Sequence, residues 1–296
     1  MFDPRVSPPV ALGFSILALS TSAILVRWSV APSVVVAFYR VLFTLLLLAP
    51  VALARHRADF RALSARDGLV AAVTGIALAI HFAAWFESLE WTSVAASVTL
   101  VQTQPVFVAV GAVLLLDERV TARTGGGIAL ALCGAVVMSV SDLLAGSAFA
   151  GTALYGNALA VLGAVMAACY VLAGRSLRQR VALLPYVTVV YGACTLCLLG
   201  LALAGGEALT GYPPREWALF LAMAIGPGVL GHTVVNWALA HLESSVVSVS
   251  LLGEPVGATL LALVLLAEVP GAFTVAGGAV VLAGIVVTAR AQRLGT

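Results

Sequence analysis

The sequence has few charged residues and no lysine at all. Of its 296 residues only 9% are charged, 62% are apolar, and the mean hydropathy is +1.11. A soluble domain carries about 25% charged residues, so this chain has too little charge to cover a surface that faces water on all sides. The shortage of charge therefore excludes a soluble protein and predicts an integral membrane protein.

The missing lysine excludes two kinds of chemistry. All 15 basic residues are arginine, whereas the phosphate-binding loop of an ATPase needs a lysine, and so does a Schiff base with retinal or pyridoxal phosphate. The net charge of +2 is too small to indicate a nucleic-acid partner. We therefore expect no cofactor and no nucleic acid.

Familiar reactive motifs are missing as well. The sequence contains neither HExxH nor GxSxG, and its histidines are scattered along the chain, so the motifs do not predict an enzyme. The cysteines all lie inside apolar runs, and we expect them to be small buried apolar residues. They are Cys133, Cys169, Cys194 and Cys197.

Long apolar runs, separated by proline, glycine and charge, predict ten transmembrane helices. About 20 helical residues cross the hydrocarbon core of a bilayer, and the runs have this length. They lie near residues 8–27, 32–54, 68–87, 92–116, 122–141, 151–174, 184–204, 215–238, 245–267 and 271–289.

The distribution of arginine predicts the orientation. With ten spans, twelve arginines fall on one side of the membrane and only Arg27 and Arg215 on the other, while Arg40 lies within the second span. Basic residues collect in cytoplasmic loops. Both termini are therefore expected in the cytoplasm. The membrane is expected to be a bacterial-type inner membrane.

The two halves of the chain repeat each other at an offset of 150 residues. The matched pairs are Pro105 with Pro255, Glu118 with Glu268, Gly127 with Gly277 and Gly134 with Gly284, and an offset of 151 pairs His81 with His232. Each half holds five expected spans, so the second must be inserted upside down relative to the first, as in many secondary transporters. The sequence predicts an all-α membrane protein of two inverted five-helix repeats, residues 1–146 and 147–296.

These repeated residues carry a resemblance. The first copy reads Pro105-Val106-Phe107, then Leu114 to Glu118, Gly127 and Gly134; the second reads Glu254-Pro255-Val256, then Leu265 to Glu268, Gly277 and Gly284. This pattern resembles the EamA-type members of the drug/metabolite transporter superfamily, over essentially the whole chain. The resemblance implies a cavity between the halves, lined mainly by spans 1, 3, 4, 6, 8 and 9. It also implies export or exchange of small metabolites, often amino acids, without ATP.

Polar residues inside the spans are the candidates for substrate binding, because a charged side chain in the bilayer costs roughly 2.5–3.5 kcal/mol and usually faces a cavity or a partner. We select His81, Trp85, Gln102, Gln104, Tyr170, His232, Asn236 and Glu254.

The residue before the repeated proline differs between the halves. Glu254 precedes Pro255, whereas Gln104 precedes Pro105, so the acidic position is single. Glu254 has three open roles: it binds a substrate ammonium group, it carries a coupling proton, or it is a protonated carboxyl bonded to backbone that the proline frees. Gln102 and Gln104 bind either substrate or a neighbouring helix.

His81 and Trp85 are four residues apart and share one face of the third span, and His232 and Asn236 repeat this spacing in the eighth. An imidazole and an indole on one face suit a zwitterion with an apolar or aromatic side chain. The alternative is packing between helices with a neutral histidine. Tyr170 has the same two alternatives.

The remaining polar and small residues suggest structural roles. Arg40 is expected to snorkel or to pair with a loop acid rather than to contact substrate. Glu118 and Glu268 end their spans and are expected to accept bonds from neighbouring amides. The glycines of the fifth and tenth spans predict close helix packing, within the fold or in a homodimer.

The sequence favours a secondary transporter that exports small organic metabolites, with amino acids, including aromatic or bulky apolar ones, as the preferred substrates. Import or exchange of another metabolite or of a drug-like cation stays open, and so does an entirely different class, a membrane-embedded enzyme.

The arginine distribution makes the first prediction. Single cysteines are placed at Ala62, Ser176 and Thr210 after the native cysteines are replaced. A membrane-impermeant thiol reagent should label the first two only from the cytoplasm and the third only from outside. Labelling of Ala62 and Thr210 from the same side would rule out the ten-span topology.

Overall fold

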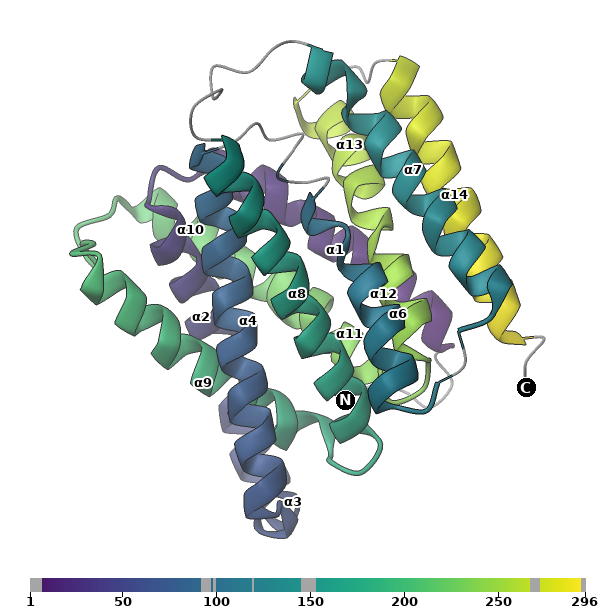
Figure 1. Ribbon diagram of the computed structural model, residues 1–296. Helices are drawn as coiled ribbons and strands as arrows, with labels where there is room; N and C mark the ends of the chain where they lie inside the picture. The colour runs from purple at the N-terminus through teal and green to yellow at the C-terminus, as the bar shows by residue number, and fades with distance from the viewer. Residues whose placement is uncertain are drawn as a thin grey trace.

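The structure, a computed structural model, describes residues 7–91, 97, 100–118, 120–144, 153–266 and 272–293. Every regular element within these ranges is a helix, and the helices form one bundle (Figure 1). The boundary expected between residues 146 and 147, and Glu268, lie outside the described ranges.

The first half forms helices where long apolar runs were predicted, and two of them, α1 and α6, begin with proline in the first turn, where its missing N–H costs no hydrogen bond. They are α1 (Pro8–Trp28), α2 (Ser33–Arg55), α4 (Ala65–Trp91), α6 (Gln104–Leu115) and α7 (Ala122–Leu144). One short helix, α3 (Arg57–Ala62), occupies the predicted loop after α2.

The second half contains two spans that depart from a regular α-helix. Its continuous helices are α8 (Ala153–Arg178), α9 (Leu183–Ala204) and α14 (Ala272–Arg293). The predicted eighth span runs through α10 (Pro214–Met223), the π-helix η1 (Ala224–Thr233) and α11 (Val234–Ala238), and the ninth through α12 (Ser244–Leu251) and α13 (Gly253–Leu266).

Length and hydropathy mark this protein as multi-pass. Within the described residues seven helical segments are long and apolar enough to cross a membrane. Three shorter apolar helices, Gln104–Leu115, Ala122–Val137 and Val275–Thr288, lie where the fourth, fifth and tenth spans were predicted. Seven segments of the described chain thus have the length and hydropathy of a full span, and the three shorter helices do not reach that length.

The two halves pack mainly against each other rather than each within itself. The extensive contacts join α4 with α8 and α9, α2 with α9, α1 with η1 and α13, α6 with α8, and α7 with α14. In the repeat, α4 corresponds to η1, α6 to α13, and α8 to α1. The contact of α4 with α8 therefore corresponds to that of η1 with α1, and the contact of α6 with α8 to that of α13 with α1. The bundle thus has the contact pattern of two related halves.

Small residues hold α7 and α14 side by side (Figure 1). A Cβ atom added to Gly284 would stand 2.5 Å from the Ala131 backbone nitrogen, and one added to Gly134 would stand 2.5 Å from the Val281 nitrogen. Real Cβ atoms do not approach backbone so closely, so both positions require glycine. Gly127, Gly134 and Gly284 therefore pack closely between these two helices within one chain.

The expectation that all four cysteines are buried is wrong for two of them. Cys194 is buried and Cys197 is intermediate, but Cys133 and Cys169 are exposed on the outside of the bundle. The physical reason is the solvent: a bilayer accepts apolar side chains on the outer surface as readily as the core does, so an apolar run does not by itself imply burial.

The packing of α7 on α14 makes the second prediction. Gly284→Ala should lower the free energy of unfolding by about 1–3 kcal/mol, because the methyl group forces the two backbones apart. Thermal unfolding of the purified protein in detergent measures the change.

Gly125→Ala on α7 is the matched control. A Cβ at Gly125 meets nothing within 4 Å, and alanine is the better helix former, so this variant should be neutral or stabilised by up to about 1 kcal/mol. Equal melting temperatures for the two variants would contradict the packing described here.

Candidate functional site

A cavity of about 160 Å³ lies between the two halves. A single water needs about 10–15 Å³ of such space, so the cavity has room for a small organic molecule. Its polar lining residues are Ser22, Arg40, His81, Trp85, Gln102, Gln104, Tyr170, His232 and Glu254. Seven of the eight residues selected from the sequence therefore share one cavity.

Two helix breaks place polar residues at the cavity. The ninth apolar run is interrupted between α12 and α13, so Glu254 and Pro255 stand in the first turn of α13. In the first half, α6 begins at Gln104 and also has its proline in the first turn. The Ser20 hydroxyl of α1 donates a hydrogen bond to the backbone oxygen of Glu254 (2.9 Å). A proline in the first turn of a helix has no preceding turn to disturb. The breaks therefore present side chains to the cavity, and the Ser20 hydroxyl satisfies the Glu254 carbonyl.

A third irregularity, the π-helix η1, carries His232. It contains Pro227 between two glycines, and proline cannot donate the backbone bond of a regular α-helix. Two hydroxyls bond to carbonyls of this segment: Thr44 donates to the Ala224 oxygen and Thr233 to the Gly228 oxygen, both at 3.2 Å. The wider π turn is typical of functional positions, and here it presents an imidazole to the cavity.

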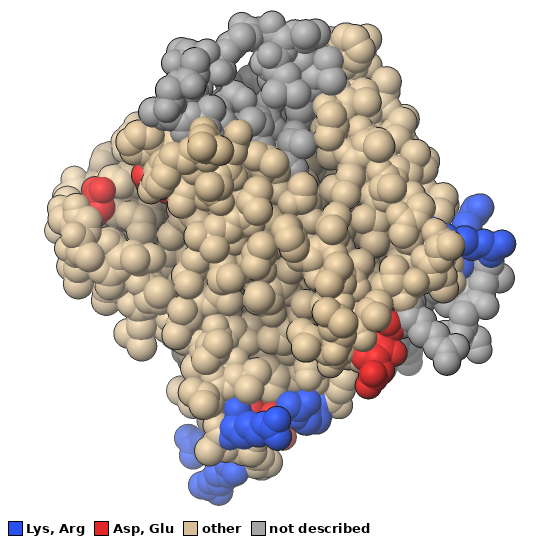
Figure 2. All heavy atoms as spheres, viewed as in Figure 1, with Lys and Arg blue, Asp and Glu red and all other residues tan. Residues whose placement is uncertain are grey.

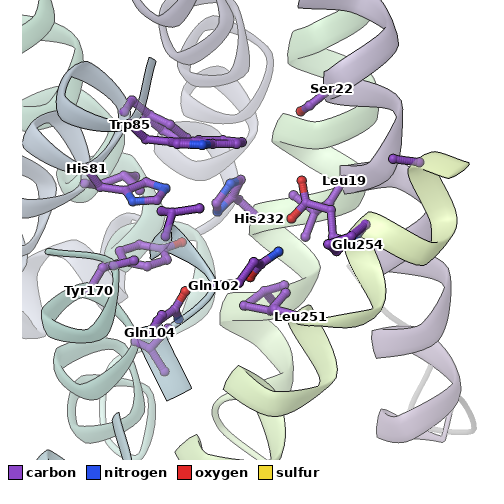
Figure 3. Close-up of a pocket in the computed structure, with 18 of the residues that line it drawn as sticks. Leu19, Ser22, His81, Trp85, Gln102, Gln104, Tyr170, His232, Leu251 and Glu254 are labelled. Atoms are coloured by element: carbon purple, nitrogen blue, oxygen red, sulfur yellow. The ribbon is translucent and has the colours of Figure 1, made fainter. Parts of the chain in front are cut away.

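Aromatic side chains from α4, α8 and η1 form one wall of the cavity (Figure 3). The His81 and Trp85 rings are stacked with centroids 5.9 Å apart, and the Tyr170 ring meets His232 edge-on at 5.9 Å. His81 Nδ1 lies 2.9 Å from the Gly163 carbonyl oxygen, so Nδ1 carries the hydrogen and donates. Glu254, Ser22 and Leu19 stand on the other side, with Gln102 and His232 between (Figure 3).

Asn236 is buried behind this wall rather than in it. Its side chain is fully buried, and Nδ2 donates to the Tyr170 hydroxyl (2.5 Å) and to the His232 backbone oxygen (2.9 Å). Asn236 and Trp85 occupy equivalent positions in the two repeats but have different surroundings. Trp85 reaches the cavity, whereas Asn236 positions Tyr170.

Several buried polar atoms at the cavity have no hydrogen-bond partner among the described residues. They are Ser22 Oγ, Trp85 Nε1, Gln104 Nε2 and His232 Nδ1. Buried polar atoms in proteins are nearly always paired, so a group of unpaired ones around a cavity indicates that a ligand or water completes them. The remaining lining is apolar, with Leu19, Leu78, Phe82, Val101, Val171, Val235 and Leu251.

Arg40 is the residue that sequence reasoning missed. It was expected to snorkel or to pair with a loop acid, but its side chain is only 2% exposed and it lines the cavity. Its guanidinium lies over the Phe82 ring, with Cζ 4.7 Å from the centroid. One signal in the sequence was available: Arg40 alone among the arginines fell on neither side of the predicted membrane.

A polar cluster at one end of the bundle joins the halves around Glu118, just beyond α6. Its carboxylate accepts hydrogen bonds from Arg175 Nε of α8 (2.8 Å), and from the Ser244 hydroxyl (2.6 Å) and backbone nitrogen (3.1 Å) at the start of α12. Neighbouring Glu243 lies in the loop before α12, and burial, with the Glu118 charge adding to it, raises its pKa. Glu118 thus ties three helix ends together.

Comparisons with known proteins agree with this arrangement. The sequence model of the EamA-like transporter family matches residues 10–140 and 154–290. An uncharacterized transporter of Archaeoglobus fulgidus is 26% identical over 224 residues, 75% of each chain. A probable terminal-alkyne amino-acid exporter of Streptantibioticus cattleyicolor is 29% identical over 193 residues, 64% of this chain and 62% of that protein. One crystal structure has the same fold, with a TM-score of 0.78 at 23% identity over 98% of this chain and 99% of that one.

The Glu118 cluster makes the third prediction. Glu118→Ala should lower the free energy of unfolding by about 1–3 kcal/mol, because it leaves Nε of the partly buried Arg175 and the Ser244 backbone amide without an acceptor. Thermal unfolding in detergent measures the loss.

Arg180→Ala is the comparison, since Arg180 pairs with Asp67 at the surface with about half of its side chain exposed (52%). An exposed pair contributes about 0–1 kcal/mol. If Glu118→Ala costs no more than Arg180→Ala, the cluster does not join the halves in the way described.

Proposed function

This chain belongs to the EamA-like transporter family, and we propose that it exports amino acids by alternating access, without ATP. The observation that carries the proposal is the cavity between the halves, which combines unpaired polar atoms with an apolar lining. Membership of a transporter family sets aside the membrane-embedded enzyme.

The topology we propose is ten spans in two inverted five-helix repeats, with both termini in the cytoplasm of a cell with a bacterial-type inner membrane. The contact pattern that survives exchange of the halves supports the repeat. The arginines support the orientation: on the visible face they gather near α3 and the end of α14, and a wide uncharged band separates them from the opposite end (Figure 2). That band is typical of a surface in contact with lipid.

We propose that the halves rock against each other around the cavity. In this scheme Glu118, Arg175 and Ser244 close the cytoplasmic end, because they link α6 of the first half with α8 and α12 of the second. Inverted repeats that move as units open a midplane site to one side at a time. The state described by the structure is then one in which the cytoplasmic end is closed.

Amino acids are the proposed substrates for two reasons. A zwitterion offers both donors and acceptors to the unpaired atoms of Ser22, Trp85, Gln104 and His232, and its side chain matches the apolar lining. One relative is named as a probable amino-acid exporter. The Trp85 ring provides a large flat surface with a free N–H, which favours bulky apolar and aromatic side chains.

Proteoliposomes test the proposal directly. Vesicles loaded with labelled leucine, tryptophan or lysine, with and without a proton gradient, should release the first two in a saturable manner and without ATP. Trp85→Ala should weaken apparent affinity for tryptophan most, and His81→Ala should weaken it for all amino acids, each by roughly 5- to 100-fold where a buried partner is left unpaired.

Phe14→Ala serves as the control variant, because Phe14 of α1 is 69% exposed on the outside of the bundle and does not approach the cavity. It should transport like the wild type. Unsaturable flux would identify a channel, and flux of cationic drugs or other metabolites without amino acids would replace the proposed substrate.

Glu254 has two roles under the proposal, as a site for the ammonium group or as the carrier of a coupling proton. Its carboxylate has no hydrogen-bond partner in the described part of the chain and faces the cavity (Figure 3). Glu254→Gln preserves its shape and removes its titration. The fourth prediction is that this variant loses accumulation driven by a proton gradient; retention of full accumulation would assign the proton elsewhere.

A further inference from the structure

Arg40 is a buried cation without an anionic partner in contact. Its side chain is 2% exposed, and no carboxylate lies within ion-pair distance of it among the described residues. None of its five N–H groups donates a hydrogen bond to a described residue, and its one specific contact is the face of the Phe82 ring. A buried charge is costly unless it is paired and hydrogen-bonded. Arg40 has neither kind of partner among the described residues, so a bound anion would stabilise it.

Its surroundings compensate the charge only in part. The Phe82 ring attracts the cation through its negative face, an effect smaller than an ion pair. A second void of about 10 Å³ adjoins Arg40, Thr44, Tyr191 and His232, which is space for about one water. A water of that size would not neutralise the charge of the guanidinium.

The opposite charge stands in the same cavity but not beside it. Glu254 and Arg40 both line the main cavity, and their charges interact through space without direct contact. The space between them therefore lies between a basic and an acidic side chain. A guanidinium presents donors in a planar fork that matches the two oxygens of a carboxylate.

We propose that Arg40 binds the carboxylate of the transported molecule, so that the cavity selects small apolar molecules that carry a free carboxylate. The inference rests on the proposed transport function and deepens it by naming the residue that recognises one end of the substrate. Glu254 faces the other end, where an ammonium group completes the charge balance. The apolar residues Leu78 and Phe82, next to Arg40, accept the aliphatic part.

Binding of three probes of one shape tests this. Leucine has both charges, leucinamide lacks the carboxylate charge, and 4-methylpentanoate lacks the ammonium group. Isothermal titration calorimetry on the whole protein in lipid nanodiscs measures each affinity. In Arg40→Gln the affinities for leucine and 4-methylpentanoate should fall about 10- to 100-fold, while that for leucinamide should stay equal or rise, because a repelling charge is removed.

Arg57→Gln makes the same chemical change on exposed α3 and should leave all three affinities unchanged. Arg40→Lys covers the case in which Arg40→Gln does not fold: it keeps the charge but loses the planar fork, so leucine and 4-methylpentanoate should weaken several-fold and leucinamide should not.

The outcomes separate the inference from the proposed function. Equal leucine binding by folded Arg40→Gln or Arg40→Lys and by the wild type overturns the role of Arg40 and leaves amino-acid transport standing. If the wild type binds 4-methylpentanoate but not leucine, and Arg40→Gln loses that binding, the inference is supported and amino acids are overturned as substrates. Wild-type binding of neither carboxylate overturns the inference.

Discussion

The bilayer offers no hydrogen-bond partners to the backbone, and this constraint decides where the helices of this protein are allowed to break. The breaks before Gln104 and before Glu254, and the π turns of η1, all lie at the cavity, where side chains from other helices reach the backbone. The hydroxyls of Ser20, Thr44 and Thr233 bond to carbonyls of the two interrupted spans in the second half. The same breaks aim the polar side chains inward, so satisfying the backbone and building the site are one structural solution.

The cavity is electrostatically uneven although the halves are related. Each half provides one charged residue, Arg40 from α2 and Glu254 from α13, and the two occupy positions that do not correspond in the repeat. Gln104 stands where the second half has Glu254. A symmetric site would bind a molecule equally in two opposite orientations. Under the proposed recognition, departure from the repeat at these positions gives a bound molecule a direction.

Packing between the halves serves both stability and movement. On the side of α7 and α14, glycines bring the helices into backbone contact and leave no space for side chains. Around the cavity, contact is made by larger side chains, and at one end of the bundle the halves are joined by polar links such as that of Glu118 with Arg175. In the proposed mechanism the former region keeps the halves together while the latter changes between states.

The sequence by itself determined the class of the protein, the ten apolar runs, the two repeated units and most of the polar residues that line the cavity. These features depend on composition and on spacing along the chain, which survive without knowledge of the fold. It did not determine that Arg40 is buried, that Asn236 supports Tyr170 instead of facing the cavity, or that Cys133 and Cys169 lie on the outer surface. In a membrane protein nearly every residue of a span is apolar, so hydrophobicity does not distinguish the face toward lipid from the face toward the protein. Only the tertiary structure decided those directions, because they depend on the rotation of each helix against its neighbours.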